Sequence, residues 1–341
     1  MPASRQGAGP TWFGPFGHGP AVVAVGGGHG LSASLRALRR LTDNVTAVVG
    51  VADDGGSSGR LRQEFAIPPP GDLRMALAAL CGDDPVGRSW SRVLQHRFAG
   101  TGALGGHAVG NLLISALWET TGGVVEGLDF LGALVEARGR VLPSTTEPME
   151  LVAEVEGLPG LAIGESVVVR GQADVASSGG TVVDIRLEPS DAQVCEEAAE
   201  AVMDAEFLVL GPGSWFTSVL PHFEIDGLRS ALEQTPAKRI LVLNLESHTQ
   251  ETAGYLPETH LVVLRSRYPQ MRLDLVLADP RAVPDEARLR AAARDLGAEL
   301  LLERLAAPAV AETLPTAAHS PDLLAAAFGT VIGRGRIPAW R

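Results

Sequence analysis

Short apolar runs alternate with amphipathic segments along most of this chain. Residues 21–25 (AVVAV) form an apolar run that ends in glycines, and residues 31–41 place leucines at helical spacing. Residues 45–51 are again apolar and largely β-branched, which is typical of a strand buried on both faces of a parallel sheet. Because parallel strands joined by a helix form a right-handed βαβ unit, the pattern predicts an α/β fold with a mostly parallel sheet flanked by helices.

The pattern changes between about residues 140 and 188, where short alternating segments are separated by Gly, Pro and Ser. This change predicts a small, β-rich antiparallel insertion. Outside it the sequence predicts helices at 73–80, 108–118, 191–205 and 285–297, and strands at 207–210, 239–245, 272–278 and 299–303. We therefore expect a single α/β domain over residues 21–335 that carries the insertion.

Composition narrows the class of protein and its partners. The first 20 residues are rich in Gly and Pro and lack the features of a signal peptide, so we expect a disordered tail. The formal net charge of -12 disfavours binding to nucleic acid or to an anionic membrane. No apolar run approaches the roughly 20 residues of a membrane-spanning helix. The lack of such a run predicts that the protein does not insert into a membrane. Cys81 and Cys195 stand far apart without metal-ligand spacing, which favours a reducing compartment and therefore a cytoplasmic protein.

A glycine-rich segment joins the first predicted strand to the first predicted helix. In such a place backbone N–H groups approach a phosphate closely, and the helix dipole favours its negative charge. Gly28, Gly30 and Ala33 satisfy the spacing G-x-G-x-x-A, although glycines also serve tight turns. His29 either contacts the phosphate or caps the turn. We predict a phosphate loop at Gly27, Gly28, His29 and Gly30.

Asp53 and Asp54 end the second predicted strand, about 20 residues beyond the glycines. They could hold a ribose hydroxyl, as in a dehydrogenase, or Mg²⁺ beside a diphosphate, or they could only terminate the strand. The next residues, 55–62, are interpreted as a second flexible loop that offers Ser57, Ser58 and Arg60 to phosphate or carboxylate groups.

Further polar residues lie where other helices are predicted to begin. Asp72 is a plausible N-cap of one such helix. His107 and Asn111 stand one turn apart, either as a buried structural pair or as ligand contacts. A third glycine turn contributes Gly211, Gly213 and Ser214, and a later strand end contributes Asn244 with Glu251 and Thr252 after it. We expect most of these residues to meet at the carboxyl edge of the sheet, where such folds bind ligands.

Several catalytic signatures are absent from the sequence. It contains no G-x-x-x-x-G-K-[ST] loop, no G-x-S-x-G elbow and no zinc-ligand spacing. No general base or nucleophile stands out. Whether the protein is an enzyme is therefore open at this point.

Five segments in this order resemble the YvcK/CofD-like family, and they match its YvcK branch more closely. The segments are VGGGHGLS, VADDGGSSGRLR, PPGDLRMALAAL, GHAVGNLLISAL and LGPGSWFTSVLPH. The resemblance implies a Rossmann-like core and a cytoplasmic gluconeogenesis factor, needed for growth on gluconeogenic carbon sources and for cell shape through peptidoglycan synthesis. It further implies binding of a nucleotide sugar such as UDP-N-acetylglucosamine, without an established reaction. The motif positions are Gly27, Gly28, Gly30, Asp53, Asp54, Ser57, Ser58, Arg60, Asn111, Gly211, Gly213 and Ser214.

The sequence departs from the family pattern at two places, His29 and Thr249-Gln250. Our leading hypothesis is a nucleotide-sugar-binding regulatory factor with a protein partner in cell-wall synthesis, and a homodimer is left open. The first alternative is a Mg²⁺-dependent 2-phospho-L-lactate-type transferase with Asp54 as the metal ligand. The second alternative is an NAD-dependent oxidoreductase.

Overall fold

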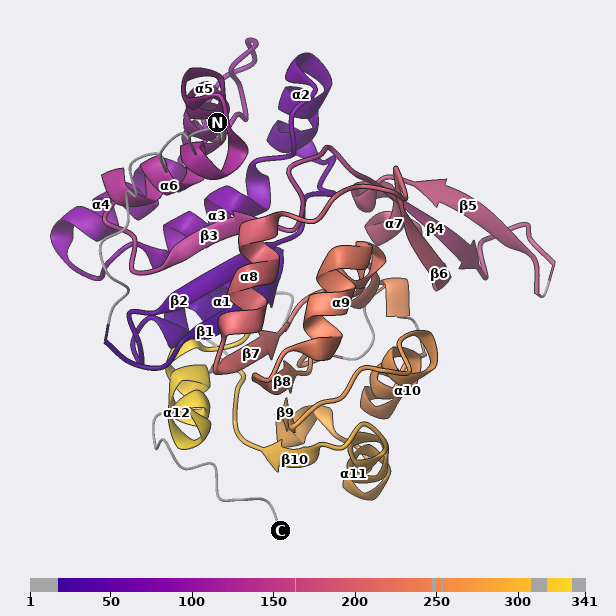
Figure 1. Cartoon of the computed structure of the whole chain (residues 1–341). Helices are drawn as coiled ribbons and strands as arrows, with labels where there is room; N and C mark the ends of the chain where they lie inside the picture. The colour runs from indigo at the N-terminus through magenta and orange to yellow at the C-terminus, as the bar shows by residue number, and fades with distance from the viewer. Residues whose placement is uncertain (1–17, 163, 247–249, 253, 308–317, 333–341) are drawn as a thin grey trace, which may run out of the picture.

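The structure is a computed structural model that describes residues 18–162, 164–246, 250–252, 254–307 and 318–332 (Figure 1). Residues 1–17 of the predicted tail, Thr249, and residues 333–335 of the predicted domain lie outside the described residues.

Within the described part of the chain, seven parallel strands form a central sheet in the order β10-β9-β8-β7-β1-β2-β3. The strands are β1 (Val22–Gly26), β2 (Val45–Val49), β3 (Arg140–Pro143), β7 (Phe207–Leu210), β8 (Lys238–Val242), β9 (Leu275–Ala278) and β10 (Glu299–Leu302). Every residue of β1 and β2 is buried, as their uninterrupted apolar sequences predict. The structure confirms the predicted α/β fold with a mostly parallel sheet.

Helices flank this sheet, and some of them pack on other helices rather than on the strands. They are α1 (Gly28–Leu38), α2 (Gly56–Phe65), α3 (Gly71–Leu80), α4 (Pro85–Gln95), α5 (Val109–Thr121), α6 (Val124–Leu134), α8 (Glu196–Asp204), α9 (Asp226–Gln234), α10 (Pro257–Arg267), α11 (Glu286–Asp295) and α12 (Pro321–Val331). The strand order runs outward in opposite directions from β1 and β7. Because parallel crossovers are right-handed, the helices of the two halves lie on opposite faces. Helix α1 packs with α3 and α12, and α8 packs with α9 (Figure 1).

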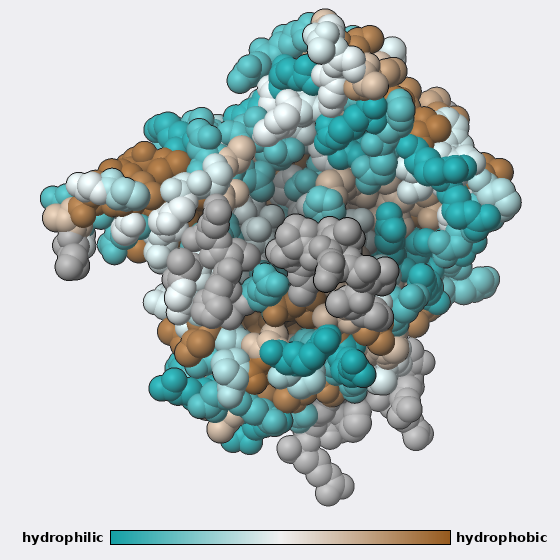
Figure 2. All heavy atoms as spheres, turned by 180° about the vertical axis from the view of Figure 1, so that it is seen from behind, coloured by the Kyte–Doolittle hydropathy of each residue, from teal (hydrophilic) through white to brown (hydrophobic). Residues whose placement is uncertain are grey.

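A smaller antiparallel sheet projects from this core, as predicted (Figure 1). It contains β4 (Glu150–Glu156), β5 (Ser166–Arg170) and β6 (Thr181–Glu188) in the order β5-β4-β6, with the short helix α7 (Gln172–Ser177) between the last two in sequence. Figure 2 shows hydrophobic surface on this projecting sheet, where Val168 and Val183 have exposed fractions of 54% and 42%. The insertion begins after β3, because residues 140–143 pair with β2 in the main sheet.

Two local predictions were wrong. Residues 56–65 form helix α2 where a flexible loop was expected, because Ser57, Ser58 and Leu61 are buried on one side of it. Asp72 is the second residue of α3, since the helix begins at Gly71 after Pro70. The Gly211–Ser214 turn leads into helical structure as predicted, in the form of a short π-helix, η1 (Trp215–Val219), and a 3₁₀ helix, η2 (Leu220–Glu224).

Candidate ligand site at the carboxyl edge of the sheet

The carboxyl ends of β1 and β7 lie side by side, because the two strands pair in parallel up to Val25 and Leu210. Strand order reverses between them, so this is the topological switch point of the sheet. We call residues 26–30 and 211–214 together the switch-point edge. The structure thus brings together Gly27, Gly28, His29, Gly30, Gly211, Gly213 and Ser214 of the predicted site.

The N-terminus of α1 is open at Gly28. This residue has a φ of +59°, and a Cβ there would meet no atom of the described residues within 4 Å. The His29 side chain is exposed. The Leu31 N–H donates to the Gly27 carbonyl at 3.3 Å, and the N–H groups that precede it lie in the first turn, where a helix offers donors to an anion.

Gly30 serves a different purpose from Gly28. A Cβ on Gly30 would lie 2.0 Å from the carbonyl oxygen of Pro212, far inside van der Waals contact. The Ser34 hydroxyl donates to the Gly211 carbonyl at 3.1 Å, and so α1 also bonds to the same turn. Gly30 therefore permits the close packing of α1 against the β7 turn.

Asp72 places a carboxylate in front of α1. It accepts a hydrogen bond from the Gly28 backbone N–H, and its Oδ2 lies 2.5 Å from where a Cβ on Gly27 would be. Burial, and then the negative charge of Asp53, raise the pKa of Asp72 to about 7. The Asp72 carboxylate thus occupies the Gly28 N–H group, although the sequence predicts that this loop binds a phosphate.

Asp53 lies next to Asp72 in the turn that follows β2. Its Oδ1 accepts a hydrogen bond from the Gly55 N–H at 3.0 Å. A Cβ on Gly71 would lie 2.8 Å from Asp53 Oδ2 and 2.2 Å from Ser58 Oγ, and glycine is therefore required there. The fold brings Asp53 and Ser58 to the start of α3, beside the carboxylate that faces α1.

Asp54 faces the insertion. Its Oδ1 accepts a hydrogen bond from the Ala173 N–H in the first turn of α7, at 2.9 Å. Gly171 leaves room for it, because a Cβ there would lie 2.1 Å from Asp54 Oδ2. In the same helix, Gln172 Nε2 donates to the Thr217 carbonyl at 2.6 Å. Asp54 therefore helps to attach the insertion to the carboxyl edge, and its predicted contact with a ligand stays a prediction.

Asn244 and Glu251 hold the turn after β7. The Asn244 side chain forms two hydrogen bonds with Gly213, accepting from its N–H at 3.0 Å and donating to its carbonyl at 2.8 Å. The buried Glu251 carboxylate accepts hydrogen bonds from the backbone N–H groups of Phe216 and Trp215, and burial raises its pKa. The start of η1 therefore also holds an internal carboxylate.

Ser57 and Asn111 belong to a buried cluster between α2 and α5. Ser57 Oγ accepts hydrogen bonds from the Ala108 N–H at 3.3 Å and from Asn111 Nδ2 at 3.1 Å, and lies 3.0 Å from His107 Nδ1. Burial lowers the pKa of His107, so its neutral ring can accept the Ser57 proton. Asn111 Oδ1 accepts from Arg74 Nε at 2.8 Å. Both predicted site residues thus have internal partners, and their ligand roles stay predictions.

Arg60 lies on the exposed side of α2. Its Nη2 donates to the Gly105 carbonyl at 2.9 Å and its Nη1 to the Ala103 carbonyl at 3.4 Å. The side chain therefore binds the loop before α5, a contact that no local sequence pattern indicates.

The described residues contain no group of three or more His, Cys, Asp or Glu side chains able to hold a metal ion. The neighbouring carboxylates of Asp53 and Asp72 are nevertheless a chemically suitable pair for Mg²⁺, which commonly takes one or two carboxylates together with phosphates of a ligand. Sequence reasoning missed Asp72 as a site residue, although an acidic side chain in the first turn of a helix beside a glycine loop could have indicated it.

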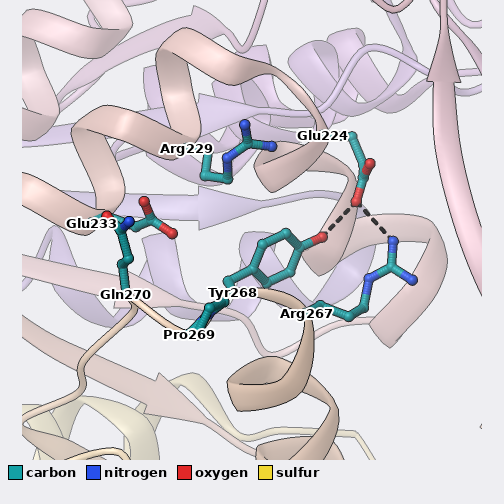
Figure 3. Close-up of a pocket in the computed structure, with 7 residues that line it drawn as sticks. All are labelled: Glu224, Arg229, Glu233, Arg267, Tyr268, Pro269 and Gln270. Atoms are coloured by element: carbon teal, nitrogen blue, oxygen red, sulfur yellow. Dashed lines mark hydrogen bonds and ion pairs between the residues drawn. The ribbon is translucent and has the colours of Figure 1, made fainter.

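A separate cavity of about 450 Å³ lies beside the insertion (Figure 3). There the side chains of Arg267 and Tyr268 point toward Glu224, whose Oε1 accepts from the Tyr268 hydroxyl at 2.5 Å and from Arg267 Nη2 at 3.1 Å. Arg267 also forms an ion pair with Asp184 of β6. The ion pair with Asp184 attaches the insertion to the end of α10, and the bonds to Glu224 attach η2 to the same place. We assign both a structural role.

No helix in the described residues is both long enough and apolar enough to cross a lipid bilayer.

The parallel sheet, its reversal of strand order and the glycine turns at its carboxyl edge define a doubly wound, Rossmann-like α/β protein.

Comparison with known proteins identifies the family. The model of the family described as 2-phospho-L-lactate transferase CofD matches residues 22–304. A protein of Mycobacterium tuberculosis (strain CDC 1551 / Oshkosh) with the name "Putative gluconeogenesis factor" is 47% identical over 319 residues, which cover 92% of this chain and 90% of the relative. The "Gluconeogenesis factor" of Bacillus subtilis (strain 168) is 34% identical over 273 residues, covering 80% and 83%.

A solved structure agrees with these relatives. The crystal structure of a UPF0052 family member from Bacillus halodurans superimposes with a TM-score of 0.79 and 31% sequence identity, covering 91% of this chain and 98% of that one. The chain therefore belongs to the CofD/UPF0052 family, in the YvcK branch whose relatives are named gluconeogenesis factors. This confirms the resemblance found in the sequence.

Proposed function

We propose that this protein is a gluconeogenesis factor that binds a nucleotide sugar at the switch-point edge, with UDP-N-acetylglucosamine as the first candidate. The observation that carries the proposal is the open N-terminus of α1 at Gly28, beside the Gly211–Ser214 turn, where the strand order reverses. The names of the relatives support the role in gluconeogenic growth. The ligand and the roles in cell shape and peptidoglycan synthesis rest on the family resemblance.

The diphosphate of the ligand would contact the first-turn N–H groups of α1, where it meets the Asp72 carboxylate. Like charges at this distance repel each other, so the carboxylate must be neutralised. Protonation can achieve this, because the pKa of Asp72 lies at about 7. Mg²⁺ held by Asp53 and Asp72 would also supply the positive charge. Ligand binding should therefore strengthen when Mg²⁺ is added above neutral pH.

A substitution at Gly28 tests the location. Asn tolerates a positive φ better than most residues, and Gly28→Asn would place a side chain in the open space before α1. The matched control is Gly122→Asn, because Gly122 has a φ of +78° and, within the described part of the chain, likewise no atom within 4 Å of a Cβ. Calorimetric titration with UDP-N-acetylglucosamine should show binding to the wild type and the control, and an affinity at least about tenfold weaker for Gly28→Asn.

The titration has clear contrary outcomes. A folded wild type that binds no UDP-N-acetylglucosamine, with or without Mg²⁺, contradicts the proposed ligand. Equal affinities for the two glycine variants would place the ligand elsewhere. Binding of NADH in its place, followed by fluorescence, would favour the oxidoreductase hypothesis.

A second candidate is a Mg²⁺-dependent 2-phospho-L-lactate-type transferase. The match of the CofD family model and the pair of neighbouring carboxylates, Asp53 and Asp72, favour it. Of the two predicted strand-end carboxylates, Asp53 is better placed than Asp54, which bonds to α7. Incubation with the guanylyl-linked phospholactate donor, a deazaflavin acceptor and Mg²⁺ tests it, and product that disappears in Asp53→Asn would establish the transferase.

We further propose that a protein partner in cell-wall synthesis recognises the ligand-bound state, and that the protein acts in the cytoplasm. Affinity capture with wild type and Gly28→Asn, each with ligand, should recover such a partner only with the wild type.

A further inference from the structure

A second cavity, of about 390 Å³, lies between α1, α3 and α4. Arg36 and Arg39 line it from the end of α1, Cys81 and Asp83 from the segment after α3, and Arg88 and Arg92 from α4. We call it the arginine cavity. Arg36 and Arg39 follow Gly28 by 8 and 11 positions along the chain. At a rise of about 1.5 Å per residue, these positions place the cavity roughly 12 to 17 Å from the switch-point edge.

Positive charge dominates the arginine cavity. Among its lining residues, Asp83 faces four arginines as the single carboxylate. The neighbouring Asp84 is engaged elsewhere, because its Oδ1 accepts hydrogen bonds from the N–H groups of Val86 and Gly87, both at 2.9 Å, at the start of α4. This concentration of positive charge is unusual in a chain whose formal net charge is -12.

Most of these guanidinium groups have no carboxylate partner. In the part of the chain that the structure describes, Arg36, Arg88 and Arg92 form no ion pair, and Arg88 bonds only to the Asp83 carbonyl. Arg36 lies in the last turn of α1, where a cation is favourable beside the helix dipole. Arg92 likewise lies in the last turn of α4, whereas Arg88 lies near the start of α4, where the helix dipole disfavours a cation. Gathering these cations therefore costs free energy that an anion would offset.

Arg39 is the most deeply buried arginine of the cavity. Its side chain is 6% exposed, and its Nη2 pairs with Asp83 Oδ1 at 2.6 Å, a carboxylate that is itself 65% exposed. The Arg39 Nε atom is buried without a hydrogen-bond partner among the described residues. A guanidinium carries five N–H donors, so this site has donor capacity in reserve.

The size and chemistry of the cavity indicate the class of ligand. Arginine forks match phosphate geometry with paired hydrogen bonds. A volume of about 390 Å³ lies in the range of pockets for small molecules. The Cys81 thiol at its wall is unreactive, because burial raises its pKa to about 11. We propose that the arginine cavity binds the phosphate group of a small anion, either inorganic phosphate or a phosphate monoester.

The test uses the full-length protein and two matched double variants. Arg36→Gln with Arg92→Gln removes two exposed guanidinium groups of the cavity. Arg294→Gln with Arg304→Gln removes the same charge from exposed arginines elsewhere. The probes for calorimetry are inorganic phosphate, glucose 6-phosphate and glucose.

We expect at least one phosphate compound to bind the wild type and the control, and glucose to bind neither. The cavity variant should bind at least about tenfold more weakly, since charge-assisted hydrogen bonds are lost. Tighter binding of glucose 6-phosphate identifies a monoester as the occupant, and equal or tighter binding of inorganic phosphate identifies the free ion.

Three results would overturn the proposal. They are the absence of binding at millimolar concentrations, an equal loss in both double variants, and loss of phosphate binding in Gly28→Asn. The last result would assign the phosphate to the switch-point edge. Conversely, failure of UDP-N-acetylglucosamine to bind leaves the arginine cavity unaffected, so the two proposals fail separately.

Discussion

The switch-point edge and the arginine cavity lie at opposite ends of α1 and offer different donors to an anion. At the switch-point edge the donors are backbone N–H groups, and carboxylates of the chain already lie against them, Asp72 at α1 and Glu251 at η1. In the arginine cavity the donors are side chains, and Arg36, Arg88 and Arg92 form no ion pair among the described residues.

This difference predicts different responses to solution conditions. An anion at the switch-point edge competes with a carboxylate, so its affinity should depend on pH and on Mg²⁺. An anion in the arginine cavity is held mostly by exposed charges, those of Arg36, Arg88 and Arg92, so its affinity should fall as ionic strength rises. Four sets of substitutions test the comparison, from the largest expected effect to the smallest.

Gly30→Ala, compared with Gly28→Ala, should show that Gly30 is required for packing and Gly28 is not. Its Cβ would lie 2.0 Å from the Pro212 carbonyl oxygen, so we expect a loss of about 3 kcal/mol in the free energy of unfolding. The Cβ of Gly28→Ala would meet none of the atoms that the structure describes, so this change should cost only about 1 kcal/mol, because of the positive φ. Urea denaturation of both variants measures the difference. Equal losses would show that the two glycines do not have distinct roles.

Asp72→Asn should stabilise the protein at about pH 8. The pKa of Asp72 is about 7 in the folded state, above its ordinary value of 3.8, because the fold disfavours ionisation of this carboxyl. The wild type therefore loses stability as the pH rises from 3.8 to about 7. Asn can still accept the Gly28 hydrogen bond without the charge. We expect a gain of about 1 to 2 kcal/mol at pH 8 and little change at about pH 4.

Thermal unfolding across this pH range measures the Asp72 effect. Asp191→Asn, at an exposed position, is the control and should leave the pH profile unchanged. An Asp72→Asn profile parallel to that of the wild type would contradict the assignment.

Asp54→Ala should loosen the attachment of the insertion. Loss of the acceptor for the Ala173 N–H should cost about 1 kcal/mol, as for a helix N-cap, and should speed amide hydrogen exchange in α7. Asp54→Asn retains an acceptor and should have a smaller effect. If Asp54→Ala instead left α7 protection unchanged and abolished ligand binding, Asp54 would belong to the ligand site.

Arg36→Gln should change the free energy of unfolding by less than about 0.5 kcal/mol, because the side chain is exposed and has no ion-pair partner in the described structure. Its effect should appear in the thermal shift produced by phosphate, which should shrink. A large loss of stability without phosphate would show that Arg36 has a structural role.

Much of the core could be predicted from local sequence. The strands β1 and β2 are uninterrupted apolar runs, and only a parallel sheet covered on both faces buries such runs completely. The segment 56–65 could not be predicted, because glycines and serines favour a loop locally, whereas burial of Leu61 and the bonds of Ser57 favour the helix. Strand β3 was included in the insertion because its sequence carries no sign of which sheet it joins.

The candidate site, like the fold, could be predicted only in part from the sequence. The order of glycines and acids along the chain predicted a carboxyl-edge site, since parallel strands bring their ends to one edge. It did not predict that Asp54 bonds to α7, or that Ser57 and Asn111 bond to each other at 3.1 Å. These partners are distant in sequence, so no local pattern identifies them.

The sequence by itself determined the α/β class, the family and the glycine turns that end β1 and follow β7, because local periodicity and backbone freedom are properties of short segments. Tertiary structure alone decided which glycine is open and which is packed, and which carboxylate faces α1. It also gathered the arginines of α1 and α4 around one cavity. These outcomes depend on how distant segments pack, where a few ångströms separate a free donor from an occupied one.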